Sequence, residues 1–384
     1  MDFTKIRVLV AESGKQAHAM IKGMKELGCH VTVVCGSKYD ACYSSKYPDK
    51  KILFENPSGD TEKKAAFLLK EIKESHYDVL MPIGEKSTSL VNEREEEFKN
   101  VIKVACAPMK AYIQVYNKQN TFDKAIEIGT PCPYTRHSAQ TVDDYLTKAR
   151  FPLIIKPRQG LGSIGFHKFK DEAELREWLA RPSFDIDDYV LQEFVEFDHR
   201  IGTLVFMDEH GNACTSYNTD VLRQFPPDAG SAILIKTVQA PEIQEKFIHL
   251  LRELHWQGYA AGCFMIDKNT GEPKLLEING RIPATVKLAF MCGFNIARQM
   301  LEMTYGEEVT KYPYYTGKDM YVRHFGTDLA WFLKAKERFS SKPSWFSWKD
   351  TCDVLYCKDD PRPFWTDLWE NVLLYHAKMR KKQH

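Results

Sequence analysis

The sequence predicts an α/β protein with a parallel sheet near its N-terminus and mixed, α+β structure after it. Two observations carry this prediction: strand and helix patterns alternate over the first hundred residues, and a β-hairpin pattern stands far downstream. At 384 residues, 43% of them hydrophobic, the chain is long enough for two or three domains with substantial cores.

The N-terminal region has the strand, helix, strand order of a parallel sheet. Apolar runs at residues 6–11 and 30–35 flank an amphipathic helical pattern at residues 15–27. Strand patterns recur at residues 77–83 and 101–105 around an acidic helical segment. Because strands that alternate with helices usually run parallel, we expect one parallel sheet here.

A lysine and a glycine-rich loop follow a later apolar strand, in LIIKPRQGLGSIGF at residues 153–166. Glycines let backbone N–H groups approach phosphate oxygens, a serine hydroxyl adds a donor, and the lysine supplies an ammonium. The segment therefore predicts a nucleoside triphosphate site made by Lys156, Gly160, Gly162, Ser163 and Gly165.

Two other phosphate-binding motifs do not fit this loop. In a dinucleotide-binding unit the last glycine opens a helix, whereas residues 166–169 alternate like a strand and the next helix signal starts at Asp171. A P-loop has its lysine after the glycines, and Lys156 precedes them. We therefore expect the loop to join two strands; an ordinary glycine turn is the alternative.

The downstream hairpin predicts a metal site. Residues 262–267 and 273–279 read as two strands joined by a turn that contains Gly271. Mg²⁺ prefers oxygen ligands such as carboxylates and amides, and a neighbouring arginine can neutralise charge on a transferring phosphoryl group. Strand alternation puts three such side chains on one face: Glu277, Asn279 and Arg281.

The register of the hairpin decides whether a second carboxylate joins this face. If Met265 pairs with Glu277, or the register differs by two, Asp267 lies on the same face. Alternation turns Leu276 and Ile278 toward the core. The apolar flanks favour a buried or cleft-lining hairpin, in which carboxylates without a cation would be costly. A solvated polar face is the alternative.

Taken together and in order, these segments resemble the ATP-grasp superfamily of ATP-dependent ligases, in particular the branch of the carbamoyl-phosphate synthetase large subunit and biotin carboxylase. The resemblance covers roughly residues 6–308 and rests on NKQNTFDKAIEIGTPCPYT, LIIKPRQGLGSIG, YVLQEFVEF and LLEINGR. It implies an ATP-grasp fold with a parallel N-terminal domain, a small mobile subdomain and a larger mixed-sheet subdomain.

The resemblance also implies roles for individual residues. Lys118 and Lys156 would contact the nucleotide phosphates, with residues 160–165 folding over them. The hinge would hold adenine through Gln192, Glu193 and Val195. Mg²⁺, with Mn²⁺ as an alternative, would be bound by Asp267, Glu277 and Asn279. The catalytic groups at the reacting phosphate would be Arg281 and Lys156.

One departure from the family concerns the residues after the hinge. Relatives often have a glycine where this chain has Phe197. The resemblance therefore leaves the ribose ligand open among Glu196, Asp198 and His199, and a solvated loop residue is the alternative for each.

We expect four parts along the chain, divided at Pro108 and near the hinge. They are a parallel α/β domain at 1–107, a small ATP-grasp subdomain with the glycine loop at 108–190, a large subdomain with the hinge and metal site at 191–310, and an aromatic-rich extension at 311–384. The extension holds five of the seven tryptophans and ends near a basic KMRKK run. Packing onto the enzyme body and docking of a protein or peripheral membrane partner both explain it.

Composition excludes several classes of protein. A net charge of +1 gives no general attraction for nucleic acid. Ten cysteines without a CxxC pair fit free thiols in a reducing compartment better than disulfides or zinc ligands. The N-terminus opens directly on a strand pattern, and no apolar run reaches the length of a membrane span. We therefore expect a cytoplasmic protein, with a homodimer as one arrangement left open.

The resemblance implies an ATP-dependent carboxylate-amine ligase that forms an amide through an acyl phosphate and releases ADP and phosphate. Its partners would be a small carboxylate and an amine, and the segment DVLRQFPPDAGSAILIKT offers three substrate-binding candidates, Arg223, Ser231 and Lys236. The alternatives are a carboxylate-thiol ligase or small-molecule kinase of the same fold, and a non-catalytic nucleotide-binding or scaffolding protein.

Overall fold

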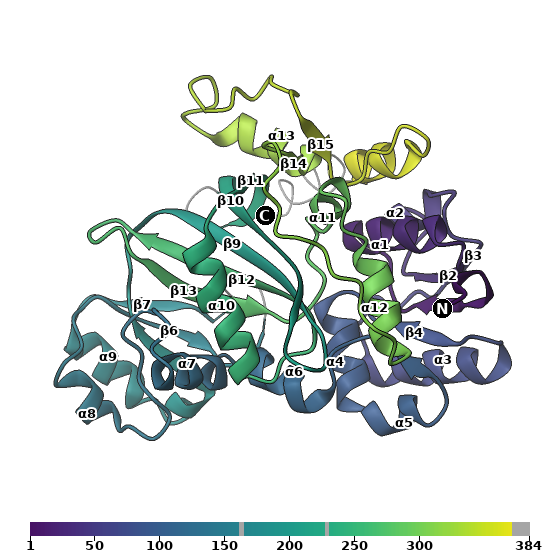
Figure 1. Cartoon of the computed structure of the whole chain (residues 1–384). Helices are drawn as coiled ribbons and strands as arrows, with labels where there is room; N and C mark the ends of the chain where they lie inside the picture. Colours follow the sequence, from purple (N-terminus) through teal and green to yellow (C-terminus); the bar gives the residue numbers. More distant parts are fainter. Residues whose placement is uncertain (161–164, 227–229, 371–384) are drawn as a thin grey trace, which may run out of the picture. The chain divides into compact units, whose positions relative to one another are not determined.

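The computed structural model describes residues 1–160, 165–226 and 230–370, and divides into two compact units. The first unit consists of residues 1–108, 221–238 and 281 onward, and the second of residues 109–220 and 239–280. Figure 1 labels their helices and strands. The four-part division expected from the sequence is finer than this one and stays a prediction.

The first unit begins with a sheet whose strands alternate with helices. Its N-terminal elements are η1 (Phe3–Lys5), β1 (Arg7–Val10), α1 (Lys15–Glu26), β2 (His30–Cys35), α2 (Ala41–Ser44), β3 (Lys50–Leu53), α3 (Thr61–Glu74), β4 (Val79–Met81), α4 (Glu85–Glu93), α5 (Glu95–Lys99) and β5 (Lys103–Val104). Its later elements are β11 (Ser231–Val238), α11 (Lys287–Met291), α12 (Ile296–Thr304), β14 (Tyr321–Arg323), α13 (Phe325–Lys334) and β15 (Thr351–Asp353).

The N-terminal sheet has the order β3-β2-β1-β4-β5 with every neighbouring pair parallel. This confirms the parallel sheet predicted from the alternating pattern. The central strand β1 is apolar throughout its buried part because helices cover both faces. Leu68, Leu90 and Phe98 of α3, α4 and α5 pack with Leu9 and Leu80 on one face, and α1 packs against β2, α11 and α12.

The second unit contains two antiparallel sheets. Its elements are α6 (Met109–Tyr116), α7 (Lys118–Glu127), α8 (Val142–Leu146), β6 (Leu153–Pro157), β7 (His167–Phe169), α9 (Glu172–Leu179), η2 (Ile186–Asp188), β8 (Tyr189–Glu193), β9 (Phe197–Met207), α10 (Pro241–Glu253), β12 (Gly258–Asp267) and β13 (Pro273–Asn279). Strand β10 (Ala213–Phe225) begins in this unit and ends in the first one.

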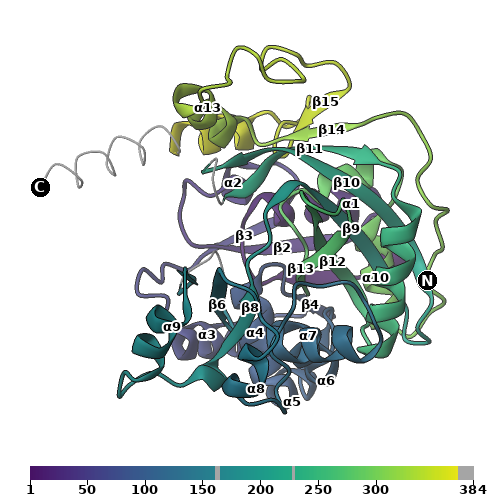
Figure 2. The same cartoon turned by 90° about the vertical axis from the view of Figure 1, so that its left-hand side faces the viewer.

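The smaller sheet carries the lysine strand. Its order is β7-β6-β8, and Ile155 of β6 pairs with His167 on one side and Leu191 on the other. In Figure 2, β6 and β8 lie side by side near α8 and α9. The glycine loop therefore joins two antiparallel strands, as predicted, and Asp171 caps α9 by accepting the Glu174 N–H at 3.0 Å.

The larger strands of the second unit carry the predicted hairpin. Strands β13, β12, β9 and β10 follow one another with antiparallel pairing. The observed return strand, Pro273–Asn279, has the predicted bounds, and its partner begins four residues earlier than predicted because β12 also pairs with β9.

The C-terminal region of the first unit is built on β11, which pairs antiparallel with β14, while β15 pairs parallel with β14. Helix α13 packs against β11 and lies near β14 and β15 in the view of Figure 1. Trp331 and Ala335 pack on Ile233, with Phe332 and Trp345 against them. Part of the aromatic extension is therefore a packed core, as one of the two sequence interpretations required.

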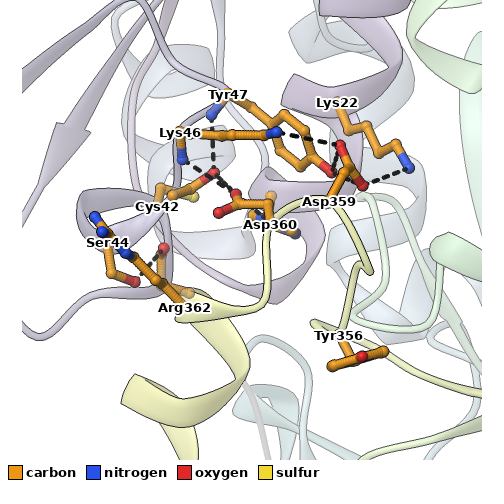
Figure 3. A network of polar contacts seen from close by, with 12 residues as sticks. Lys22, Cys42, Ser44, Lys46, Tyr47, Tyr356, Asp359, Asp360 and Arg362 are labelled. Atoms are coloured by element: carbon orange, nitrogen blue, oxygen red, sulfur yellow. Dashed lines mark hydrogen bonds and ion pairs between the residues drawn. The ribbon is translucent and has the colours of Figure 1, made fainter.

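Two aspartates attach this C-terminal region to the N-terminal elements of the same unit (Figure 3). Asp360 is buried and accepts hydrogen bonds from the Ser45 hydroxyl at 2.5 Å and the Lys46 N–H at 3.1 Å. The Tyr47 hydroxyl donates to Asp359 at 2.9 Å. Side chains more than three hundred residues apart thus hold the two parts of the first unit together.

Within the residues that the structure describes, no helix is long and apolar enough to cross a membrane. All ten cysteines are free thiols in the structure.

Candidate nucleotide and metal site

Lys156 brings the lysine strand and the return strand of the hairpin together. Its Nζ donates to the backbone carbonyl of Leu276 on β13 at 2.9 Å. The same atom lies 4.4 Å from the ring centroid of Phe122 on α7. The two segments that the sequence assigned to one triphosphate site therefore meet within the second unit.

The surroundings of Lys156 weaken its charged form. Burial lowers the pKa of the Lys156 ammonium from 10.5 to about 8, the Glu277 carboxylate opposes this shift, and the charge of Lys118 adds to it. A desolvated ammonium beside a second cation favours an incoming anion, which would replace the missing solvation. This is the electrostatic state expected of a phosphate-binding lysine before its ligand arrives.

Lys118 lies at the start of α7 and points to the glycine loop. Its Nζ donates to the carbonyl of Gly160 at 2.9 Å, and Asn117 caps the helix by accepting the Gln119 N–H at 3.0 Å. Because this helix begins beside the loop, its first-turn N–H groups and the lysine face the same region.

Gly160 and Gly165 stand at the two ends of the glycine loop, and a side chain at each would meet different surroundings. Gly160 has φ +111 and open space around it, whereas a Cβ on Gly165, at φ +78, would lie 2.7 Å from Pro157 Cγ. Both backbone conformations favour glycine. The remaining loop candidates, Gly162 and Ser163, lie outside the described residues.

Glu277 and Asn279 form the candidate metal-binding pair. Both are half-buried, and the Asn279 Nδ2 donates to Glu277 Oε1 at 3.3 Å. Among the residues placed by the structure, no three His, Cys, Asp or Glu side chains gather into a metal site. The pair supplies one carboxylate and, after rotation of the amide, one amide oxygen. This donor set fits Mg²⁺, which keeps waters and substrate phosphates as its other ligands.

A β-bulge in β13 explains how the hairpin presents these groups. Cys263 pairs with Glu277 and Phe264 with Leu275, so Leu276 is an extra residue without a cross-strand partner. The prediction that Leu276 points to the core is therefore wrong: Leu275 is fully buried in its place, and Leu276 is half-buried. The carbonyl of the bulged residue is the one that accepts the hydrogen bond from Lys156.

Asp267 is not placed with the metal-binding pair. It shares their face, but it lies four residues beyond Cys263, which corresponds to about 13 Å along the strand. Its carboxylate accepts the Asn269 N–H at 2.8 Å and pairs with Lys274 Nζ at 2.6 Å. Asp267 closes the turn of the hairpin, which corrects the expected set of three ligands.

The hinge side chains are also engaged in the structure. Gln192 is buried and its Nε2 donates to the Thr135 hydroxyl at 2.7 Å, while Glu193 Oε1 accepts the Arg150 N–H at 2.7 Å. Gln192 therefore bonds to a neighbouring side chain and Glu193 to a neighbouring backbone N–H, and the contact of these residues with adenine stays a prediction. Val195 is buried as well.

The three ribose candidates stay equivalent after the structure is known. Glu196, Asp198 and His199 are all exposed at the start of β9, and the Glu196 carbonyl accepts the Lys268 N–H at 2.9 Å. Exposure leaves each side chain accessible to a ligand, so the choice among them stays a prediction.

Arg281 belongs to the first unit, because the chain passes from one unit to the other after Gly280. Its Nε lies 3.8 Å from Glu85 Oε2 at the start of α4. The role predicted for Arg281 at the reacting phosphate stays a prediction.

The substrate candidates differ in accessibility. Arg223 is buried, with Nη1 3.1 Å from Asp328 Oδ2 and its guanidinium 4.9 Å from the Trp331 ring, so it is a structural ion pair and not an accessible substrate ligand. Ser231 is exposed. Lys236 is partly exposed and its Nζ lies 3.9 Å from Asp319.

Sequence reasoning missed a second group of polar side chains, at the carboxyl edge of the N-terminal sheet. Glu12 follows β1, its burial raises the pKa of its carboxyl, and it accepts a hydrogen bond from Ser87 Oγ at 2.9 Å and another from the Gly84 N–H. Burial lowers the pKa of the nearby Lys64 to about 8. The sequence held a usable signal, because Glu12 lies two residues after β1 and Gly84 three residues after β4, at the two adjacent strands where the strand order reverses.

Phe122 was missed too, although it stands four residues after Lys118. That spacing puts both side chains on one face of α7.

The fold, the lysine strand and the acidic hairpin define a protein of the ATP-grasp class. Residues 114–312, more than half of the chain, match the family described as "Carbamoyl-phosphate synthase L chain, ATP binding domain". The chain belongs to this family of ATP-binding domains, whose members use ATP and Mg²⁺.

Curated relatives align over part of their length. The carbamoyl phosphate synthase large chain, N-terminal section, of Methanopyrus kandleri is 23% identical over 242 residues, which cover 60% of this chain and 39% of the relative. The carbamoyl phosphate synthase large chain of Clostridium botulinum is 27% identical over 174 residues, or 42% of this chain and 16% of the relative. This chain therefore spans much less than the full length of either.

Solved structures show the same fold. A biotin carboxylase from Campylobacter jejuni, in a beta-gamma-ATP complex, matches with a TM-score of 0.64 and 18% identity over 79% of this chain and 72% of its own. The biotin carboxylase domain dimer of the Hydrogenobacter thermophilus 2-oxoglutarate carboxylase, bound to MgADP, ADP and bicarbonate, matches with a TM-score of 0.65 and 19% identity over 79% and 71%.

Proposed function

We propose that the protein is an ATP-dependent carboxylate-amine ligase that works through an acyl phosphate. The observation that carries the proposal is the contact of Lys156 with the strand that bears Glu277 and Asn279. A cation suited to phosphate beside a pair of oxygen ligands is what phosphoryl transfer from ATP needs. The solved relative with MgADP and bicarbonate supports the use of a carboxylate-like substrate.

The reaction has two steps. A carboxylate oxygen of the acid attacks the γ-phosphorus of ATP, the bond to the β,γ-bridging oxygen breaks, and ADP leaves. The amine then attacks the acyl carbon, phosphate leaves, and the new amide nitrogen loses a proton. The first step is needed because a free carboxylate would have to expel oxide, which is a very poor leaving group.

The residues of the second unit have distinct parts in this proposal. Lys118 and Lys156 hold the phosphates and offset their charge. Glu277 and Asn279 would bind Mg²⁺, which when present neutralises charge on the terminal phosphates. No side chain is required as a nucleophile. The acid and the amine are unassigned, with Ser231 and Lys236 as the accessible candidates for binding them.

The test combines product identification with a matched pair of variants. Purified protein, ATP, Mg²⁺ and a pooled metabolite extract are analysed by mass spectrometry for ADP and a new amide. Glu277→Gln should reduce turnover by roughly 100-fold or more through loss of a metal ligand. Asp267→Asn, which changes a carboxylate on the same face that closes a turn, should keep most of the wild-type rate.

Each of the other outcomes would support a different function. No ADP with any pool would sink the proposal. An acyl phosphate trapped by hydroxylamine without any amine requirement would favour thiol transfer or a phosphorylated product. Tight ATP binding without turnover would favour a non-catalytic protein. The dimeric relative makes a homodimer our proposal for the assembly, to be checked by light scattering.

A further inference from the structure

Large hydrophobic side chains are exposed in one short part of the first unit. Half of the large hydrophobic side chains that are exposed in the described residues belong to the stretch from Leu333 to Trp369. Phe339, Phe346 and Trp348 are 73%, 64% and 47% exposed. Because soluble proteins rarely expose several aromatic side chains together, such a patch marks an interaction surface.

Hydrogen bonds from buried side chains fix the backbone that carries these exposed side chains. Residues 341–348 alternate between more buried and more exposed positions. On the inner side, Arg223 Nη2 donates to the Ser341 hydroxyl at 3.2 Å, and Arg323 Nη1 donates to the Trp345 carbonyl at 3.0 Å. Both guanidiniums are buried against Asp328.

The outward positions of this stretch are Lys342, Ser344, Phe346 and Trp348. Their exposure therefore follows from the same contacts that order the backbone, and not from a loose loop.

The same segment is strongly basic. Residues 333–349, which we name the aromatic-basic segment, carry five basic side chains and one acidic side chain, a net charge of +4 against +1 for the whole chain. The basic residues are Lys334, Lys336, Arg338, Lys342 and Lys349. The four lysines are exposed.

Ring contacts extend the patch to the last helical turns that the structure describes. The Phe325 ring lies 5.6 Å from Trp348 and 5.9 Å from Phe364. In the helical residues that follow Phe364, Trp365 and Trp369 stand four residues apart and are both exposed. That spacing puts the two rings on one helix face.

We propose that the aromatic-basic segment docks the protein on an anionic phospholipid surface. Aromatic side chains favour the membrane-water interface, and lysines near an anionic leaflet each add attraction. Contact would be peripheral, since none of the described helices can span a bilayer. A second copy of the chain would bring the same positive charge to the contact, which disfavours pairing of two such segments.

The test measures binding of the full-length chain to vesicles by flotation. Wild type should bind phosphatidylcholine vesicles that contain phosphatidylserine, more weakly as salt is raised, and should bind pure phosphatidylcholine vesicles poorly. Two double variants should each weaken binding roughly tenfold or more. One is Phe346→Ser with Trp348→Ser, and the other is Lys342→Glu with Lys349→Glu.

Matched controls use exposed side chains elsewhere in the first unit. Tyr39→Ser and Lys70→Glu remove an exposed aromatic and an exposed lysine, and should leave vesicle binding unchanged. Melting temperatures check that every variant folds. If a variant does not fold, quenching of wild-type tryptophan fluorescence by brominated phosphatidylcholine in anionic vesicles decides the matter, and absence of quenching counts against docking.

Three results would overturn the proposal. The first is that the wild-type protein does not float with vesicles. The second is that it binds neutral and anionic vesicles equally, and the third is that the segment variants bind as tightly as wild type. A dimer that either double variant converts to a monomer would assign the surface to contact between copies instead.

Discussion

Lys156 is the residue where burial and charge act most directly on the proposed chemistry. Its free pKa of about 8 lies well below the ordinary lysine value of 10.5, because desolvation outweighs the attraction of Glu277. ATP should bind the protonated form, so we predict that nucleotide affinity falls as pH rises through about 8. Calorimetric titration of ADP with Mg²⁺ across this range measures the effect.

Two variants test whether the Lys156 ammonium causes this pH dependence of nucleotide affinity. Lys156→Arg should flatten the pH profile because guanidinium stays protonated, and Lys156→Met should lower affinity at every pH. The thiols of Cys132 and Cys263 cannot imitate this behaviour, since burial raises their pKa to about 11 and about 12. A wild-type affinity that does not change across pH 8 would contradict the assignment.

At the same scale, sequence pattern located the charged side chains better than it located their partners. Lys156 bonds to the backbone of the strand that bears Glu277 and Asn279, and these two side chains bond to each other. Strand alternation also put Asp267 on the correct face, but only the pairing shows that it sits at the turn with Lys274. A face is set by local period, whereas distance along a face depends on register.

At the scale of elements, the bulge at Leu276 shows why alternation fails locally. One extra residue shifts every later side chain to the opposite face, and nothing in LLEI distinguishes a bulged leucine from a regular one. The parallel sheet, the loop between β6 and β7 and the helix capped by Asp171 were predictable, because each rests on contacts near in sequence. Arg223 was misread because its partner, Asp328, is over a hundred residues away.

Attachment of the C-terminal region to the N-terminal elements gives a stability prediction (Figure 3). Asp360→Ala removes two hydrogen bonds from a buried carboxylate and leaves the Ser45 hydroxyl without its acceptor. We predict a loss of about 2–4 kcal/mol in the free energy of unfolding, the cost of leaving buried polar groups unpaired. Urea unfolding at neutral pH measures it.

The neighbouring aspartate is the control. Asp359 is largely exposed and bonds to the Tyr47 hydroxyl, so Asp359→Ala should change stability by less than about 1 kcal/mol. Equal losses for the two variants would show that burial of Asp360 does not set the strength of this attachment.

At the scale of the whole molecule, the division into two units predicts where a nucleotide stabilises the chain. Most candidate ligands, including Lys118, Lys156 and Glu277, belong to the second unit. A ligand that binds only the folded state at 100 times its Kd stabilises that state by about 2.7 kcal/mol, or roughly 100-fold in an opening equilibrium. We therefore predict that Mg²⁺ with ADP slows hydrogen exchange in β6 and β13 by up to this factor.

Amides of the N-terminal sheet provide the internal control, because β1 and β2 belong to the first unit and carry none of the proposed phosphate or metal ligands. Their slow exchange should change far less than that of β6 and β13 when mass spectrometry follows peptides from both units in one sample. Equal protection of β1 and β6 would mean that the two units open together, and nucleotide binding would then stabilise the molecule as one cooperative body.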